Sequence, residues 1–253
     1  PPAGVRRDCL GWKALAWMAP SLPNVDADQW RPGTEHLESS GLAILRRQEG
    51  RTYVSLDYGA SGGPHGHADR LNLTVHANGI PWLVDFGTGS YVAETLGWYR
   101  STFAHCAPGV DGTSQLAADG LCVGFEDQGE FGWVCAQLPD NTAYAGAALQ
   151  RTVVVGPGSL VDVVQLKSST AERTLLLPWH GLGEAEADEL GVTFARPDGR
   201  LRVLLSARQP FTRIADRTRS ASGSGRSGVT SSRASSSSWR STRIRASPMA
   251  ASR

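Results

Sequence analysis

The chain has 253 residues, of which 40% are hydrophobic and 19% charged, and its net charge is +1. This apolar content suffices for one sizeable core or two small ones, and the sequence lacks the run of about 18 apolar residues that would predict a membrane span. The charge is uneven: residues 1–211 carry 16 Lys and Arg against 23 Asp and Glu, and residues 212–253 carry nine Arg and one Asp. A mildly acidic body therefore precedes a basic tail.

The first 30 residues are the only stretch with a helical pattern. Apolar residues from Trp12 to Ala19 recur at helical spacing, and Pro20 and Pro23 end the pattern. We therefore expect residues 1–30 to be a helical remnant or linker from a domain upstream.

From Gly41 onward the pattern becomes that of short strands. Asn78-Gly79 is a strong hairpin signal, and Pro81 places the start of the returning strand at an edge. Such strands, separated by Gly, Pro, Asn and Asp turns, predict an all-β fold, an antiparallel β-sandwich over residues 31–211. Candidate strands span residues 42–47, 52–58, 71–77, 80–85, 121–125, 132–138, 148–155, 160–166, 173–177, 192–195 and 201–206.

The tail, residues 212–253, is mostly Ser, Arg, Gly and Ala from residue 221 onward. It has too few large apolar residues to offset chain entropy, so we expect it to be disordered. A polymer-binding tail and a flexible linker are two interpretations. We favour a third, translation out of frame, because the strand pattern stops abruptly within the domain.

Four cysteines, namely Cys9, Cys106, Cys122 and Cys135, form no C-x-x-C pair. Cys122 and Cys135 are spaced so that they could pair across a hairpin, but free, half-buried thiols are the favoured interpretation.

Polar residues of the kind that bind metals concentrate between residues 65 and 105. In an extended chain His65, His67 and Asp69 would point to one side, and imidazole with carboxylate suits Zn²⁺. A solvated strand face explains the same string equally well. The hairpin places Asp85 opposite Asn72, so a bend near residues 69–70 is needed to bring Asp85 to His67.

The same stretch resembles the signature block of heparinase II/III-type polysaccharide lyases. The resemblance covers residues 40–185, and its central block, 65–115, is specific. The matching motifs are His65-Gly66-His67-Ala68-Asp69, Asn78-Gly79, Asp85-Phe86-Gly87-Thr88, Tyr99-Arg100-Ser101-Thr102-Phe103-Ala104-His105 and Val110-Asp111-Gly112. Cys106 departs from the family's pattern, which has Asn there.

The resemblance implies the C-terminal β-sandwich of a lyase whose helical α/α-toroid domain lies upstream and is missing here. It also implies a periplasmic or secreted parent protein, an acidic polysaccharide as substrate, and no organic cofactor. A mainly structural zinc would be bound by His67, Asp85 and His105. His65 would be a catalytic or substrate-contacting histidine at the cleft between the two domains, and Arg100 with Tyr91 or Tyr99 would face the uronate.

Such a lyase removes the proton on C5 of a uronate, so the developing negative charge must be neutralised by Arg, His or Asn. A Tyr or His acts as the base. In the family the catalytic Tyr and its Asn and His partners lie on the helical domain, so this chain alone is expected to lack turnover.

Three other functions remain open on the sequence. One is a non-catalytic, zinc-stabilised carbohydrate-binding β-sandwich. Another is a non-haem Fe(II) oxygenase, for which His67, Asp69 and His105 would supply two histidines and a carboxylate. The third is nucleic-acid binding through the basic tail, although we do not expect nucleic acid to be a partner.

Overall fold

The computed structural model describes residues 32–168, 173–207, 211–216, 225–234 and 240–246, together with Trp12 and Ala16; from residue 205 onward it describes the backbone alone. The chain divides into two compact units, residues 1–33 and 34–253. Trp12 and Ala16 are helical, and the rest of the predicted helical remnant lies outside the described residues. Nothing among these residues forms a helix long and apolar enough to cross a membrane.

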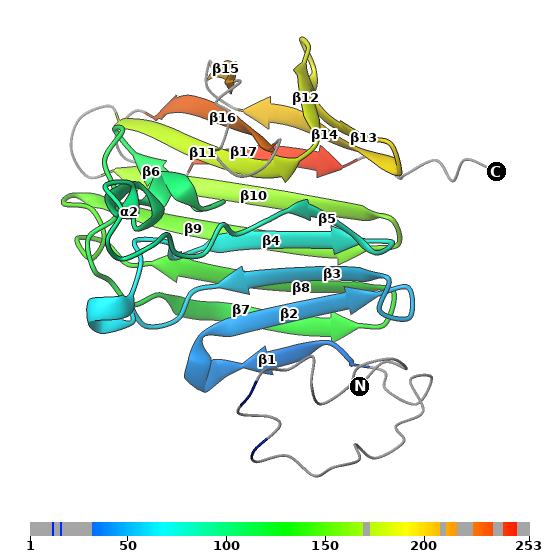
Figure 1. Ribbon diagram of the computed structural model, residues 1–253, viewed down its shortest axis with the longest axis horizontal. Helices are drawn as coiled ribbons and strands as arrows, with labels where there is room; N and C mark the ends of the chain where they lie inside the picture. The colour runs from blue at the N-terminus through cyan, green and yellow to red at the C-terminus, as the bar shows by residue number, and fades with distance from the viewer. Residues whose placement is uncertain are drawn as a thin grey trace. The chain divides into compact units, whose positions relative to one another are not determined.

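The second unit contains two antiparallel sheets that lie face to face (Figure 1). The first sheet has the order β1-β2-β3-β4-β5-β11-β16-β15, and β6 also pairs with β11. Its strands are β1 (Glu35–Leu37), β2 (Leu42–Arg47), β3 (Thr52–Asp57), β4 (Asn72–Ala77), β5 (Ile80–Leu83), β6 (Gly109–Val110), β11 (Arg173–Leu182), β15 (Phe211–Asp216) and β16 (Gly225–Ala234).

The second sheet has the order β12-β13-β14-β17-β10-β9-β8-β7. Its strands are β7 (Leu121–Gln128), β8 (Phe131–Leu138), β9 (Ala147–Gly156), β10 (Ser159–Ser168), β12 (Glu184–Ala187), β13 (Gly191–Arg196), β14 (Gly199–Ala207) and β17 (Arg240–Ala246). One short α-helix, α2 (Leu96–Tyr99), and the 3-10 turns η3 (Glu38–Ser40), η4 (Gly63–His65) and η5 (Thr102–Ala104) complete the described elements.

The core lies between the sheets and draws side chains from both. Alternate residues of β2 are buried, as are alternate residues along much of β9, which is the pattern of strands with one face turned inward. Leu45 and Trp82 of the first sheet and Leu149 and Phe194 of the second are at most 1% exposed and belong to one hydrophobic cluster. The predicted all-β antiparallel sandwich is therefore confirmed.

Each predicted strand corresponds to an observed one. The Asn78-Gly79 turn has positive φ at both residues, 53° and 77°, as a tight hairpin requires. The sequence did not predict α2, and it did not predict that β5 pairs with β11.

Three strands, β15, β16 and β17, lie wholly or largely within residues 212–253, for which the sequence predicted disorder. β16 pairs with β11, and β17 pairs with both β10 and β14. At these segments the backbone is paired, which satisfies the N–H and C=O groups of neighbouring strands whatever side chains are present. The rest of the tail lies outside the described residues.

Candidate functional site

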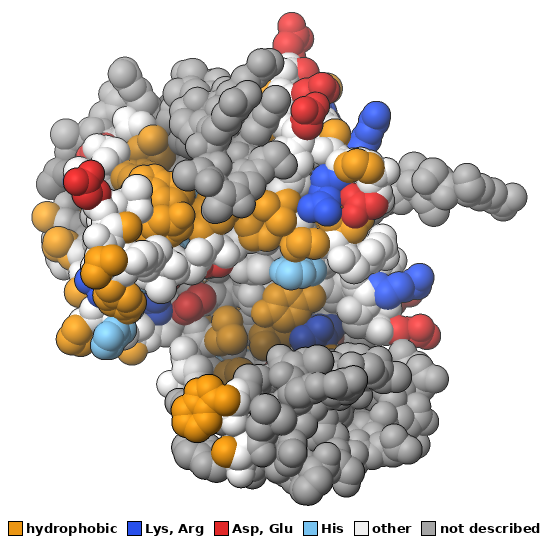
Figure 2. All heavy atoms as spheres, in the orientation of Figure 1, with side chains coloured by type: hydrophobic (Ala, Val, Ile, Leu, Met, Phe, Trp, Pro, Cys, Tyr) orange, Lys and Arg blue, Asp and Glu red, His pale blue; other side chains and the backbone are white. Residues whose placement is uncertain are grey.

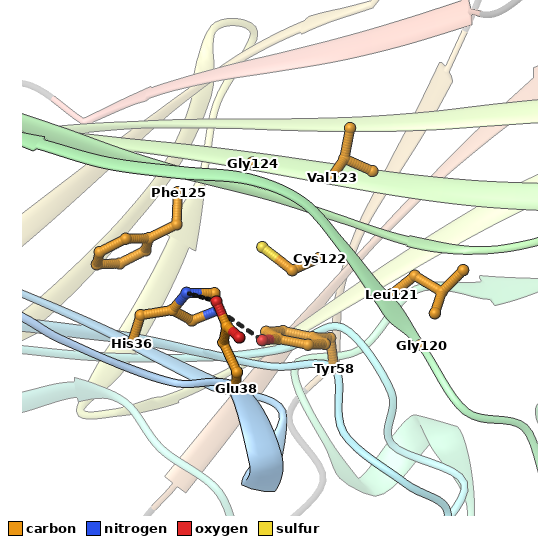
Figure 3. Close-up of a pocket in the computed structure, with 9 residues that line it drawn as sticks. All are labelled: His36, Glu38, Tyr58, Gly120, Leu121, Cys122, Val123, Gly124 and Phe125. Carbon is orange, nitrogen blue, oxygen red and sulfur yellow. Dashed lines mark hydrogen bonds and ion pairs between the residues drawn. The ribbon is translucent and has the colours of Figure 1, made fainter.

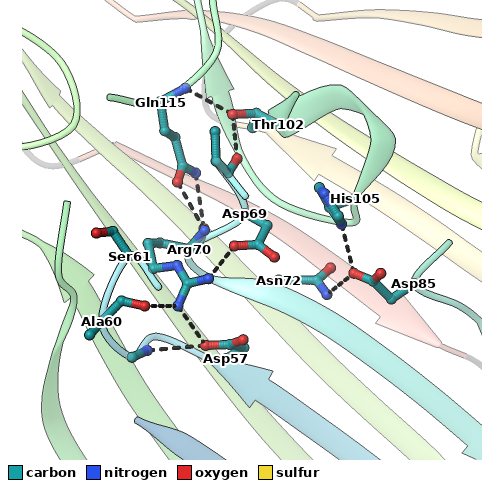
Figure 4. A network of polar contacts seen from close by, with 12 residues as sticks. Asp57, Ala60, Ser61, Asp69, Arg70, Asn72, Asp85, Thr102, His105 and Gln115 are labelled. Carbon is teal, nitrogen blue, oxygen red and sulfur yellow. Dashed lines mark hydrogen bonds and ion pairs between the residues drawn. The ribbon is translucent and has the colours of Figure 1, made fainter. Parts of the chain in front are cut away.

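Three loop segments converge beside β4 and carry most of the polar residues that the sequence singled out. They are η4 with the residues that follow it, the turn after β5, and the stretch that contains α2 and η5. Ala68 N–H donates to the carbonyl of Arg100 at 3.1 Å, which ties the first segment to the third. The three segments place His67, Asp85 and His105 in one region of the fold, and Figure 4 shows Asp85 beside His105.

The bend that the sequence required near residue 69 is present. Leu71 has φ of 65°, the left-handed region, and its N–H donates to the carbonyl of Asp57 at 2.7 Å. Asn72 N–H donates to the carbonyl of Asp69 at 3.1 Å. The chain therefore turns sharply before β4 starts, and this turn brings His67 towards His105, with ring centroids 5.2 Å apart.

A metal-binding group is formed by His67, Asp69 and His105. Each offers one ligand atom, and these atoms lie within 4.8 Å of one another. His105 is fully buried and the other two are half-buried. Two imidazoles and a carboxylate at this spacing fit a divalent cation such as Zn²⁺. The chain therefore has a possible His/Asp/His metal-binding group.

Asp85, predicted as the carboxylate ligand, contacts His105 directly. Its Oδ2 lies 2.7 Å from His105 Nδ1 and accepts a hydrogen bond from Asn72 Nδ2 at 2.7 Å, and its Oδ1 accepts from Gly87 N–H at 2.5 Å. The Asn72 side chain thus contacts Asp85, although a β-bulge between Val75 and His76 shifts the register of the hairpin that the sequence predicted. Asp69 is held by Arg70, whose Nη2 donates to its Oδ1. Two anchored carboxylates therefore flank the histidines.

Ionisation in this region is governed by the contact between His105 and Asp85. Burial alone would lower the pKa of His105, but the hydrogen bond and charge of Asp85 outweigh it, so this pKa is raised. Burial would raise the pKa of Asp85, but the hydrogen bond from His105 lowers it overall. His105 Nε2 also lies 3.0 Å from the Tyr99 carbonyl. Both ring nitrogens of His105 therefore lie beside oxygen acceptors.

His67 has the opposite tendency. Burial, and then the charge of nearby His105, lower its pKa. A neutral imidazole is the form that binds a metal. The lowered pKa of His67 therefore favours its metal-binding form near neutral pH.

The residues predicted to face the uronate gather at the exposed side of this region. His65 is exposed at the end of η4, and its Nδ1 lies 3.0 Å from the hydroxyl of Tyr91. The guanidinium of Arg100 lies 5.8 Å from the centre of the Tyr91 ring and donates to the Pro64 carbonyl at 2.5 Å. His65, Tyr91 and Arg100 thus form one surface cluster, which is named below after that prediction as the uronate-facing cluster.

Tyr99 is not part of that cluster's contacts. Its ring packs edge-on against Trp98, with centroids 5.0 Å apart, and so close to Gly89 that a Cβ there would lie 2.5 Å from it. Of the two tyrosines that the sequence left open, the structure places the Tyr91 hydroxyl beside His65.

An exposed hydrophobic surface adjoins the cluster. Tyr91 is 57% exposed, Val92 94% and Trp98 46%, and Figure 2 shows hydrophobic side chains gathered over α2 and its neighbouring loops. Beneath it lies buried His180, whose ring is 4.9 Å from that of Phe86 and 6.3 Å from that of Trp98. His180 is thus a packing residue.

Cys106, the departure from the family pattern, is fully buried. Its Sγ accepts from His180 N–H at 3.2 Å, and burial raises the pKa of the thiol to about 12. A thiol that stays protonated is a poor metal ligand, so Cys106 acts as a core residue. Cys122 and Cys135 are also free thiols, as the sequence favoured, and Cys9 lies outside the described residues.

Sequence reasoning gave no role to His36, which lines a separate pocket of about 500 Å³ (Figure 3). His36 Nε2 lies 2.6 Å from the hydroxyl of Tyr58, and its ring stacks on Phe125 with centroids 4.7 Å apart. Tyr58 is 4% exposed, and burial raises its pKa to about 12, so its hydroxyl stays protonated. The pocket has no residue in common with the metal-binding group.

Comparison with known proteins matches most of the chain to one family. The model of the heparinase II/III-like family, C-terminal region, matches residues 31–248. An alginate lyase of Stenotrophomonas maltophilia (strain K279a) is 36% identical over 162 residues, which is 54% of this chain and 22% of that enzyme.

Solved structures share the fold at low sequence identity. The heparan sulfate lyase HepC of Pedobacter heparinus superposes with a TM-score of 0.76 at 15% identity, over 95% of this chain and 39% of that one. A heparinase III structure superposes with a TM-score of 0.73 at 17% identity, over 87% and 38%. The chain thus spans about two fifths of these structures and less of the alginate lyase. Its sequence match, fold and convergent motifs lead to one conclusion: the chain belongs to the heparinase II/III-like family of polysaccharide lyases and carries its C-terminal region.

Proposed function

We propose that this chain is part of a lyase that cleaves a uronate-containing acidic polysaccharide by β-elimination. The observation that carries the proposal is the uronate-facing cluster, in which a histidine, a tyrosine hydroxyl and a guanidinium meet at an exposed surface. The family relative named an alginate lyase agrees with a uronate as substrate. Arg100 brings to this cluster a planar guanidinium, whose geometry matches that of a carboxylate.

The elimination needs three things from the protein. The uronate carboxylate must be neutralised, because the C5–H electron pair moves towards it as the proton leaves; Arg100 supplies that charge. A base must also take the C5 proton. The candidates on this chain are His65 and Tyr91, whose ring nitrogen and hydroxyl lie 3.0 Å apart. The third requirement is a proton for the leaving oxygen, because the C4–O bond breaks as the C4–C5 double bond forms.

Binding of an acidic oligosaccharide tests the proposal. We expect isothermal titration to show that the full chain binds a tetrasaccharide prepared from alginate. Neutral cellotetraose, which has the same length, should not bind detectably. Arg100→Ala should weaken binding by about tenfold to a hundredfold, because a charged hydrogen bond is worth roughly 1.5–3 kcal/mol. Arg51→Ala, a substitution in the turn between β2 and β3, is the matched control. Equal binding of the two sugars would refute the proposal.

We further propose that the two histidines of the metal-binding group hold a zinc ion with a mainly structural role. His67 and His105 would bind it together with Asp85, the carboxylate whose oxygen already meets a ring nitrogen of His105. When bound, the ion would supply a fixed positive charge that joins the segments carrying the uronate-facing cluster. The cluster's own residues would do the chemistry.

Metal content of the purified chain tests this assignment. We expect about one zinc per chain, lost in His67→Ala, Asp85→Ala and His105→Ala. Asp69→Ala is the informative comparison, because Asp69 belongs to the metal-binding group yet is engaged by Arg70. Retention of zinc in Asp85→Ala with loss in Asp69→Ala would transfer the ligand role to Asp69.

A second candidate, a non-haem Fe(II) site, is favoured by one observation: the group found in the structure is two histidines and Asp69. Iron that is retained in Asp85→Ala and lost in Asp69→Ala would support it over the lyase. The family match supports the lyase.

A further inference from the structure

The two histidines of the metal-binding group lie on segments far apart in sequence, and a buried threonine joins these segments. Thr102 is fully buried. Its Oγ1 donates to the carbonyl of Ala68 at 2.6 Å and accepts from the backbone N–H of Gln115 at 2.8 Å. One hydroxyl therefore connects the residue after His67 with the turn that leads to His105 (Figure 4).

Gln115 continues the connection. It is 5% exposed, and its side-chain amide pairs with both backbone groups of Arg70: Oε1 accepts from Arg70 N–H at 2.9 Å, and Nε2 donates to the Arg70 carbonyl at 2.9 Å. Nε2 also donates to the Pro108 carbonyl at 3.0 Å. The Gln115 side chain thus satisfies both backbone polar groups of Arg70, as a neighbouring strand would.

Together Thr102 and Gln115 form a clamp on the segment from Ala68 to Arg70. The Ala68 N–H is bonded to Arg100 as well, so both backbone polar groups of Ala68 and both of Arg70 have partners. His67 and Asp69 each lie next to a clamped residue. The clamp's other side is Thr102 itself, three positions before His105. The spacing between the two imidazoles therefore depends on the clamp.

We propose that Thr102 and Gln115 are positioning residues that hold the two halves of the metal-binding group in register. The inference rests on the proposed metal site and adds residues that do not themselves ligate. A metal site binds tightly only when its ligands are held within roughly 0.5 Å of the required geometry by surrounding hydrogen bonds. Without the Thr102 hydroxyl, the Ala68 carbonyl and the Gln115 N–H lose a buried partner and the segment is free to shift.

The test compares Thr102→Val, which keeps the branched shape and removes the hydroxyl, with Thr102→Ser, which keeps the hydroxyl. Zinc affinity is measured on the full chain by competition with a chromophoric chelator, and the visible spectrum of the Co²⁺-loaded chain reports ligand geometry. We expect Thr102→Val to bind zinc about tenfold to a hundredfold more weakly and to change the Co²⁺ spectrum. Thr102→Ser should resemble the wild type in both.

Thr152→Val is the matched control, because the Thr152 hydroxyl of β9 donates to Cys135 Sγ at 3.2 Å and not to a residue of the clamp. It should leave zinc affinity unchanged. If Thr102→Val does not fold, Gln115→Leu removes the other half of the clamp and is expected to show the same loss. If a folded Thr102→Val variant has the zinc affinity and the Co²⁺ spectrum of the wild type, the proposed role of the clamp is wrong and the metal site is unaffected. A wild-type chain that binds no zinc would overturn both.

Discussion

His180 is the buried ionisable residue of β11 whose protonation has the clearest consequence for stability. Its Nε2 lies 2.8 Å from the Phe103 carbonyl, and its Nδ1 has no hydrogen-bond partner. Burial lowers its pKa from 6.5 to about 4. Below pH 6.5 His180 is protonated in the unfolded chain, whereas in the folded chain it is protonated only below about pH 4. Acid therefore favours unfolding in this window.

The expected effect is a slope in stability against pH. The free energy of unfolding should fall by about 3 kcal/mol from this group as the pH drops from 6.5 to 4. His180→Gln should flatten the curve in that window, even if it lowers stability overall. Urea unfolding with a chelator present, at several pH values, measures it. His76→Gln, on an exposed face of β4, is the control and should leave most of the slope. An unchanged slope in His180→Gln would contradict the assignment.

Residues of the site were predictable where local chemistry was enough. His67 and Asp69 share one short motif, and the sequence identified both as candidate ligands. The pairing of His65 with Tyr91 was not predictable, because the two residues are 26 positions apart and meet only through the folded loops. The roles of Thr102 and Gln115 were hidden for the same reason. Neither residue has metal-ligand chemistry, and each acts through backbone groups.

At the scale of strands, a buried ion pair between Arg151 and Asp162 joins two neighbouring strands of the second sheet. Arg151 on β9 donates to both carboxylate oxygens of Asp162 on β10, at 2.9 and 2.6 Å. Its Nη1 also donates to the carbonyls of Leu71 and Cys106, at 2.8 and 2.5 Å. Arg151 is 0% exposed and Asp162 1%. The pair thus ties the second sheet to the two segments that flank the metal-binding group.

Breaking this pair should be costly. Arg151→Met leaves Asp162 as an uncompensated buried charge, and we expect it to lower the free energy of unfolding by about 3–5 kcal/mol. Adding Asp162→Leu should restore much of the loss, because no buried charge then remains. Urea denaturation measures both. Arg47→Met is the control: its partner Asp127 is 39% exposed, so the cost should be much smaller. A double variant as unstable as Arg151→Met would refute the explanation.

The predictability of strands follows their chemistry. β2 was predicted with its observed bounds, and the β4–β5 hairpin with nearly its observed ones, because alternation and the Asn78-Gly79 turn are local signals. The contact of β5 with β11 consists of one residue pair, Leu83 with Gly181, and no sequence signal marks it. β16 and β17 are the extreme case, since their Ser- and Arg-rich residues predict no strand and only their position between other strands explains the pairing.

At the scale of the whole molecule, the proposed function makes the uronate-facing cluster one side of a substrate site. The chain spans 38–39% of the solved lyases and 22% of the alginate lyase. Its cluster is exposed, with His65 at the surface and Tyr91 57% exposed. Elimination needs a site from which water is largely excluded, because charge stabilisation is strong only there. An open surface provides binding without that exclusion.

We therefore expect the chain by itself to bind an alginate tetrasaccharide and not to cleave it. Cleavage is followed by the ultraviolet absorbance of the C4–C5 double bond in the product, with the full-length alginate lyase as the positive control. If upstream residues supply the base and close the site, the chain alone should give no rise in absorbance at any enzyme concentration. A steady rise that disappears in His65→Ala would show instead that the base lies in this chain, and that the exposed cluster suffices for turnover.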